Sequence, residues 1–271
     1  MNKLAHLPIA LFASVMGMSG LTLGWLKAGA VGWPVAQPIG LALAIATTAL
    51  LALLLVAYGL KLLNHRGAVI EEAKHPIKLN FFAAIPIGLI LVATLWSADW
   101  PALAEPIWWI GIAAMLVATL FTMSSWINHS HYQVGHLNPA WFIPVVGNIL
   151  VPIAGMRLGH TEISWFFFSV GLVFWIILTA LVMNRLIFHD ALPDRMRPTL
   201  FILLAPPAVG FVSYLSLNGM TLDALARILY FTALFLALLL ASNAVKFLKL
   251  PFFISGWAYS FPIAAMTVAS F

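Results

Sequence analysis

Charged residues are scarce in this sequence, and their scarcity decides its class. Asp, Glu, Lys and Arg make up 8% of its 271 residues, whereas a soluble domain carries about 25%. Hydrophobic residues make up 63%, and several apolar runs exceed the roughly 20 residues that a helix needs to cross a bilayer core. The sequence therefore predicts an all-α polytopic membrane protein in which residues 1–271 form a single transmembrane domain.

Cysteine is absent altogether, which excludes disulfides and thiolate chemistry. A nucleophile–base pair and a glycine-rich phosphate loop are also missing, so neither catalysis nor a cofactor is expected. His129, His131 and His136 share one connection, which we interpret as a solvated loop, with metal binding as the alternative. The 13 basic and 8 acidic residues lie mostly between apolar runs. Because no basic soluble face results, the expected partner is the lipid bilayer and not a nucleic acid.

Ionisable residues are missing from the middle of every apolar run. Coupled pumps usually keep an ionisable group at that depth to carry the coupling ion. The absence favours passive conduction and argues against tight binding of a charged substrate. Because an ion in a dry path would meet a very large solvation cost, the path must be water-filled when open. An apolar constriction can then close it by excluding water.

Proline occurs in every second apolar run. Pro86, Pro144, Pro206 and Pro262 follow one another at steps of 58, 62 and 56 residues, and the runs between them contain none. Proline removes an amide donor and bends a helix. The alternation predicts tandem hairpins around an axis, each with one bent and one straight helix. The hairpins cover about 1–63, 64–127, 128–183 and 184–245, and residues 246–271 form a half-hairpin.

Nine membrane spans are expected from this pattern. The bent, odd-numbered spans should line a central path, because the backbone groups freed by a bend need water or protein neighbours. The straight, even-numbered spans should form an outer ring. The ninth span lacks a straight partner, so either a tenth span is missing from the sequence or a neighbouring subunit covers that face. The first explanation is favoured because five hairpins would close the repeat.

The connections between the spans carry most of the charge. Residues 64–78 are the longest charged connection, and Glu71 and Glu72 within it are expected on a short surface helix. Ten of the 13 basic residues lie on the side of the N-terminus, which places that terminus in the cytoplasm. The same basic connections favour anions as the permeant species, although helix kinks alone can serve ions of either sign.

Phe261 directly precedes Pro262 and lies among small residues in the last apolar run. A bulky ring at a bend can project into the space that the bend surrounds. We interpret Phe261 as the plug of the path, and the alternative is an aromatic side chain that is packed in the core.

Four stretches resemble one known family. They are LPIALF…MGMSGL at residues 7–21, EEAKHPIKLNFFAAIP at 71–86, LPDRMRPTLFILLAPPAVG at 192–210 and WAYSFP at 257–262. Their order resembles that of the tellurite-resistance/dicarboxylate transporter family, which includes the plant slow anion channels and bacterial tellurite-resistance proteins. The resemblance extends over essentially the whole chain.

The resemblance implies a fold and a set of roles. It implies ten helices arranged as five hairpins in quasi-fivefold order around a central pore, a homotrimer, and a place in the cell (inner) membrane. It gives Phe261 the role of the pore gate. It gives Gly17, Pro86, Pro144, Pro206 and Pro262 the roles of pore-helix kinks and lining.

The substrates that the resemblance implies are divided. Some members are anion channels, and others are carriers or exporters of C4-dicarboxylates or are linked to tellurite. Since no Lys or Arg lies near mid-membrane, we favour an anion channel for small inorganic or organic anions. A C4-dicarboxylate or tellurite-type carrier is the alternative.

Overall fold

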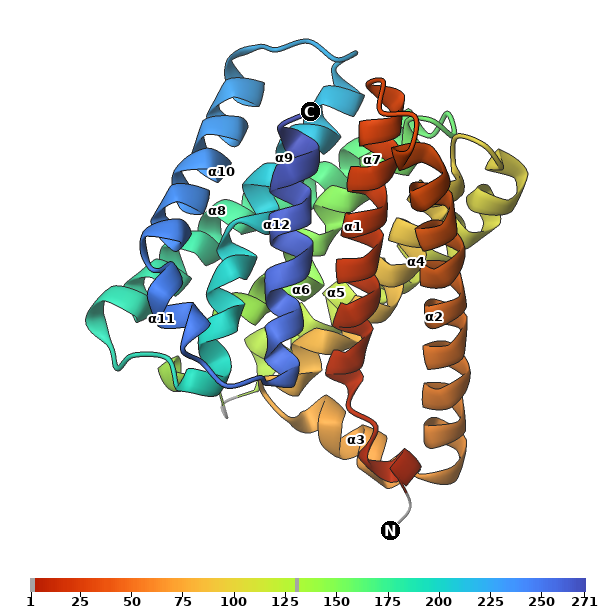
Figure 1. Cartoon of the computed structure of the whole chain (residues 1–271). Helices are drawn as coiled ribbons and strands as arrows, with labels where there is room; N and C mark the ends of the chain where they lie inside the picture. Colours follow the sequence, from red (N-terminus) through yellow and green to blue (C-terminus); the bar gives the residue numbers. More distant parts are fainter. Residues whose placement is uncertain (1–2, 130–131) are drawn as a thin grey trace.

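The computed structural model describes residues 3–129 and 132–271, and within them the chain is built from helices with no strand (Figure 1). In this part of the chain, seven helices are long and apolar enough to cross a membrane. Residues Pro139–Gly155 form a shorter apolar helical stretch. The expectation of an all-α polytopic membrane protein is confirmed, and the number of nine spans stays a prediction.

The straight helices are long and α-helical from end to end. They are α2 (Ala36–Asn64), α5 (Pro101–Asn128), α8 (Thr161–Phe188) and α10 (Ala224–Ser242). Helix α5 contains Pro106, although the straight spans were expected to contain no proline. It starts before Pro106 because Pro101 is well accommodated at the first position of a helix, where the N–H has no helical partner.

The bent spans share a different construction, in which a 3₁₀ segment precedes the α-helix. The pairs are η1 (Lys3–His6) and η2 (Ile9–Phe12) before α1 (Ala13–Ala30), η3 (Lys78–Ala83) before α4 (Ala84–Trp96), η7 (Asp194–Leu203) before α9 (Ala205–Leu217), and η8 (Ile254–Gly256) before α12 (Trp257–Ala269). The fifth span is divided further into η5 (Pro139–Phe142), α6 (Ile143–Val146), η6 (Gly147–Leu150) and α7 (Val151–Gly155).

This construction explains how most of the repeated prolines are accommodated. Pro86, Pro144 and Pro206 each lie in the first turn of an α-helical segment, directly after the irregular or 3₁₀ part. An N–H in that turn has no α-helical partner, so proline there removes no helical hydrogen bond. Pro262 differs, because it lies inside α12. The first three prolines therefore mark a change of helix type, and Pro262 is the one of the four in a helix interior.

Burial separates the bent spans from the straight ones. Of the most apolar stretch of each span, 44–72% is buried in the bent spans at residues 9–30, 78–96 and 194–217, against 22–28% in the straight helices. In the broken span Pro139–Gly155, every residue except Gly147 and Ile153 is buried. The bent spans therefore form the interior and the straight helices the exterior.

Contacts between the bent spans close on themselves. Helix α1 contacts α4, α4 contacts α7, α7 contacts α9, α9 contacts α12, and α12 contacts α1. Figure 1 shows α1 and α12 side by side although they come from opposite ends of the chain. Each straight helix lies against two consecutive bent spans, as α2 does against α1 and α4.

The charged connection after α2 forms a short helix, as expected. This helix, α3 (Arg66–Lys74), packs against the end of α2 and against η3. Glu71 is exposed, but Glu72 is buried. The expectation of a surface position is therefore wrong for Glu72, because the rotation of α3 turns its side chain toward the protein.

Candidate pore and gate

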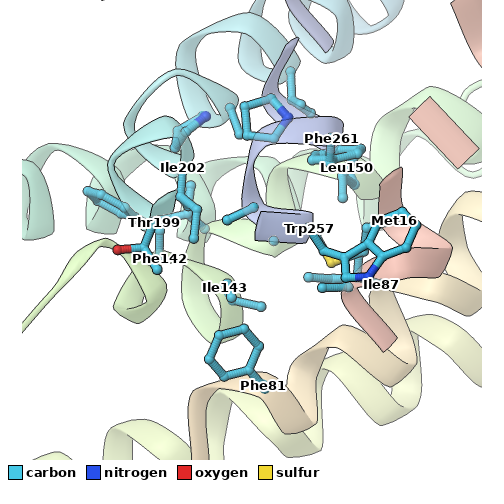
Figure 2. Close-up of a pocket in the computed structure, with 18 of the residues that line it drawn as sticks. Met16, Phe81, Ile87, Phe142, Ile143, Leu150, Thr199, Ile202, Trp257 and Phe261 are labelled. Atoms are coloured by element: carbon cyan, nitrogen blue, oxygen red, sulfur yellow. The ribbon is translucent and has the colours of Figure 1, made fainter. Parts of the chain in front are cut away.

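An apolar cavity of about 80 Å³ lies at the centre of the bent spans (Figure 2). Each of the five bent spans contributes to its wall. Examples are Ala13 from α1, Ile87 from α4, Val146 from α6, Pro206 from α9 and Phe261 from α12. Within the described residues, none of the straight helices α2, α5, α8 and α10 lines the cavity. The arrangement of spans thus produces one internal space whose wall comes from the five bent spans.

The wall of the cavity offers almost no polar group. The Thr199 hydroxyl donates to the Met196 carbonyl at 2.6 Å, and the Ser255 hydroxyl donates to the Arg195 carbonyl at 2.5 Å. Both hydroxyls are thus engaged with backbone next to the cavity. No Asp, Glu, Lys or Arg is among the described residues that line it. Water is poorly accommodated against such an apolar wall, and the described lining residues offer no charge that could pair with a substrate.

Phe261 lines the cavity from α12. Its side chain is 7% exposed, and Figure 2 shows its ring near Leu150. Pro262, the next residue, also lines the cavity. The ring belongs to the main apolar core as well. Phe261 therefore both lines the cavity and packs in the core, and its role as a plug stays a prediction.

Two glycines of α1 allow α12 to come close. A Cβ added at Gly17 would lie 2.1 Å from the Ser260 Oγ, and one added at Gly20 would lie 2.8 Å from the Ala264 Cβ. The Cβ at Gly20 would also lie 3.4 Å from Cδ2 of Phe261. The two helices therefore pack closely because small residues face each other at their contact. The Phe261 ring lies beside this contact, next to Gly20.

The structure separates the expected pore-helix residues into two groups. Pro206 and Pro262 line the cavity together with Phe261. Gly17 faces Ser260 and Trp257 at the contact between α1 and α12, and its neighbour Met16 reaches the cavity. At the other two prolines, the next residue Ile87 and the preceding residue Ile143 line the wall.

The carbonyl of Pro144 has a specific partner outside the ring of bent spans. It accepts a hydrogen bond of 2.7 Å from the Thr119 hydroxyl of α5. The same hydroxyl accepts from the Asn148 side-chain amide at 3.0 Å. A neighbouring helix thereby satisfies the backbone of the broken span, as buried backbone polar groups require.

Sequence reasoning missed most of the wall. Side chains such as Phe81, Phe142 and Leu150 line the cavity. Phe142 and Leu150 lie two residues before Pro144 and Pro152, which is a signal that could have identified them, whereas nothing in the sequence singles out Phe81. Among the described residues, no group of three or more His, Cys, Asp or Glu side chains could hold a metal ion. His131 lies outside the described residues.

Comparisons with known proteins agree with this architecture. A profile of the SLAC1 family, described as voltage-dependent anion channel, matches residues 6–271. The chain is 28% identical over 274 residues to the S-type anion channel SLAH3 of Arabidopsis thaliana, covering 98% of this chain and 43% of that protein. It is 29% identical over 265 residues to the tellurite resistance protein TehA homolog of Haemophilus influenzae, covering 96% and 79%. The chain therefore spans about half the length of the plant channels that it matches.

Proposed function

The chain belongs to the voltage-dependent anion channel (SLAC1) family, and we propose that it conducts small anions passively through the space between its bent spans. Membership confirms both the resemblance noted from the sequence and the expectation that the protein is not an enzyme. Family and helices together make it an integral membrane protein. The observation that carries the proposal is the central cavity, which is lined by all five bent spans and has no charged residue among the described residues of its wall.

The absence of charge from the wall supports a channel over a carrier. A carrier that binds a C4-dicarboxylate needs cationic partners, because burying an unpaired carboxylate is very costly. The 80 Å³ cavity offers none. The TehA homolog among the relatives keeps a tellurite-type or C4-dicarboxylate carrier as the second candidate.

Phe261 is the proposed gate of this channel. Its ring is buried, lines the cavity and lies next to Gly20 of α1. Such a ring, together with the apolar wall, favours closure by exclusion of water. Gly17, Pro86, Pro144, Pro206 and Pro262 are proposed to shape the helices that carry the wall.

The remaining expectations complete the proposal. We propose one transmembrane transport domain, hairpins in quasi-fivefold order, a homotrimer and a cytoplasmic N-terminus in the cell (inner) membrane. The closed set of contacts among the bent spans supports the ring of hairpins. A reporter fused within the connection after Leu63 should report the cytoplasm, and one fused after Asn218 should report the exterior. The opposite pattern would reverse the orientation.

Anion flux in liposomes tests the function. Purified protein should carry chloride and nitrate down their gradients without a proton or sodium gradient, and malate should move much more slowly. Flux of malate that exceeds chloride flux and saturates at low concentration would favour the carrier. Empty liposomes and liposomes with heat-denatured protein are the controls.

A further inference from the structure

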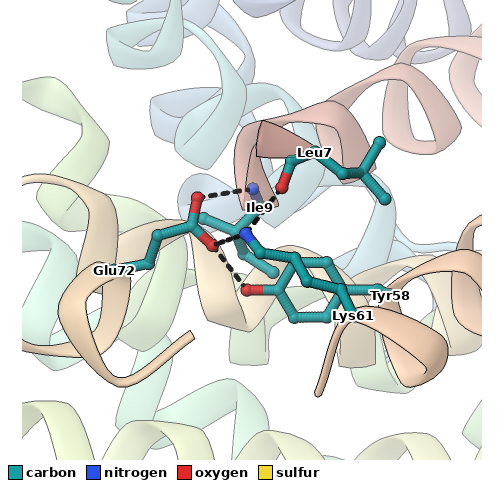
Figure 3. A network of polar contacts seen from close by, with 5 residues as sticks. All are labelled: Leu7, Ile9, Tyr58, Lys61 and Glu72. Carbon is teal, nitrogen blue, oxygen red and sulfur yellow. Dashed lines mark hydrogen bonds and ion pairs between the residues drawn. The ribbon is translucent and has the colours of Figure 1, made fainter. Parts of the chain in front are cut away.

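Two opposite charges are buried together at the end of α2. The Lys61 Nζ lies 2.7 Å from Oε2 of Glu72, which projects from α3, and their side chains are 1% and 9% exposed. Figure 3 shows this pair with Tyr58, Leu7 and Ile9 around it. The path proposed above does not include these groups, and the cavity wall does not contain them.

Each charge in the cluster has further hydrogen-bond partners. The Tyr58 hydroxyl donates to Glu72 Oε2 at 2.7 Å, and the backbone N–H of Ile9 donates to Oε1 at 3.4 Å. The Lys61 ammonium donates to the Leu7 carbonyl at 2.8 Å. Figure 3 shows that the pair thereby reaches the chain that leads into the first span.

The backbone held by this pair continues directly into the cavity wall. Ala10 follows Ile9, and Ala13 begins α1; both line the cavity. A 3₁₀ segment rises about 2 Å per residue, so Ala10 and Ala13 lie within about 10 Å of the Ile9 amide along η2. A shift of the Ile9 backbone is therefore transmitted to the wall over one short and rigid segment.

Stability alone is a poor explanation for such a pair. Replacing a buried ion pair with apolar residues of similar volume is often neutral or stabilising, because desolvating both charges is costly. Apolar side chains at positions 61 and 72, however, could neither accept from the Ile9 N–H nor donate to the Leu7 carbonyl. What the pair provides beyond packing is a defined position of the backbone before α1.

We propose that Lys61, Glu72 and Tyr58 are positioning residues that hold the segment from Leu7 to Ala13 against the cavity and thereby set the size limit for permeating anions. This inference rests on the proposed function, since a size limit requires a conducting path. It predicts that loss of the cluster admits larger anions through a path that is already open, without any change at α12.

The test compares anions of different size in an open background. In Phe261→Ala protein, the ratio of gluconate to chloride permeability is measured for Glu72→Gln, for Tyr58→Phe and for the double variant Lys61→Met/Glu72→Leu. Glu71→Gln is the matched control, because the same change is made one residue away on the exposed side of α3. The ratio should rise in the three cluster variants, least in Tyr58→Phe, and stay unchanged in the control.

A chemical readout distinguishes positioning from folding. The chain has no native cysteine, so Ala13→Cys gives a single labelling site in the wall. Since a hydrogen bond to a charged group contributes enough to shift a local equilibrium by about tenfold, Glu72→Gln should speed labelling of Ala13→Cys about tenfold. Lys61→Met should speed the labelling as well, whereas Lys61→Arg, which keeps a cationic donor for Glu72 and the Leu7 carbonyl, should label nearly as slowly as the protein with the intact cluster.

The outcomes separate the two proposals. If Phe261→Ala protein passes no anion, the proposed function fails, and the labelling rate still decides whether the cluster positions the wall. If the permeability ratio and the labelling rate of the cluster variants equal those of Glu71→Gln in folded protein, the positioning role is overturned. Where Glu72→Gln does not fold, the apolar double variant and Tyr58→Phe decide the question by the same two measurements.

Discussion

Replacing Phe261 with alanine tests the proposed gate most directly. The ring is 7% exposed and borders a cavity of about 80 Å³. A water needs about 10–15 Å³ of such volume, so the cavity has room for about five to eight waters, yet apolar cavities of about 150 Å³ stay dry. On the proposed gate role, the apolar wall and the Phe261 ring keep water out, and removing the ring should let the path fill with water.

The magnitude follows from the apolar contact that the ring makes. Burying a phenylalanine is worth about 1.5–3 kcal/mol. If the barrier to wetting falls by that amount, chloride conductance should rise roughly 10- to 150-fold, because about 1.4 kcal/mol corresponds to a factor of ten in rate. Phe261→Leu should give an intermediate increase. Single-channel recording in planar bilayers measures the change.

The control variant must remove another buried phenylalanine ring, one that lies in the core away from the cavity. Phe168 in α8 is 1% exposed, stacks on Tyr214 and does not line the cavity. Both Phe→Ala variants should lose about 3–5 kcal/mol of stability, but Phe168→Ala should leave conductance at the level of the unmodified protein. Equal conductance of folded Phe261→Ala and unmodified protein would refute the gate and leave Phe261 as a core aromatic.

Three further predictions concern the wall, the contact of α1 with α12 and the loop before η3. In an open variant, Ala205→Cys in the wall should react with a water-soluble thiol reagent, whereas Ala46→Cys on the exposed face of α2 should not; equal labelling would contradict the inside position of the bent spans. Gly20→Ala places a Cβ 2.8 Å from a methyl group of α12 and should lower stability by about 1–3 kcal/mol, whereas Gly24→Ala, with nothing within 4 Å, should not lower the Tm. Burial and neighbouring positive charges lower the pKa of His75 below 6.5 in the folded protein. On acidification the unfolded chain therefore binds the proton at a higher pH than the folded protein does. The contribution of His75 to stability is full above pH 6.5 and is lost as the pH falls through the lower pKa of the folded state. His75→Asn, which keeps an acceptor for the backbone, should show a smaller loss of Tm on acidification, and an equal loss in both proteins would remove His75 as the cause.

The alternation of proline predicted which spans lie inside, because a bend exposes backbone groups that only an interior position can satisfy. The manner of bending was not predictable from the same signal. Pro86, Pro144 and Pro206 follow a 3₁₀ or irregular segment and occupy the first helical turn, and the choice between 3₁₀ and α-helix depends on tertiary contacts that composition does not show.

The Lys61–Glu72 pair shows a second limit of sequence reasoning. Glu71 and Glu72 are chemically identical neighbours, and successive residues of a helix point about 100° apart. Which of the two pairs with Lys61 depends on how α3 is rotated about its axis against α2. The short helix has too few apolar residues for its sequence pattern to predict that rotation. The position of Phe261 in the cavity wall, in contrast, could be predicted, because its bulk, its small neighbours and Pro262 are all visible in the sequence.

The contact of α12 with α1 has a consequence for biogenesis. The chain is made from its N-terminus, so α1, α4, the broken fifth span and α9 enter the membrane before α12 exists. During that time the space between them is bounded on one side by lipid or by the insertion machinery, and no enclosed aqueous route is present. When α12 packs against Gly17 and Gly20, the ring of contacts is completed, and the same step places Phe261 in the cavity wall. On the proposed gate role, the path and the side chain that blocks it would therefore form in the same step, and no open path would exist while the protein is assembled.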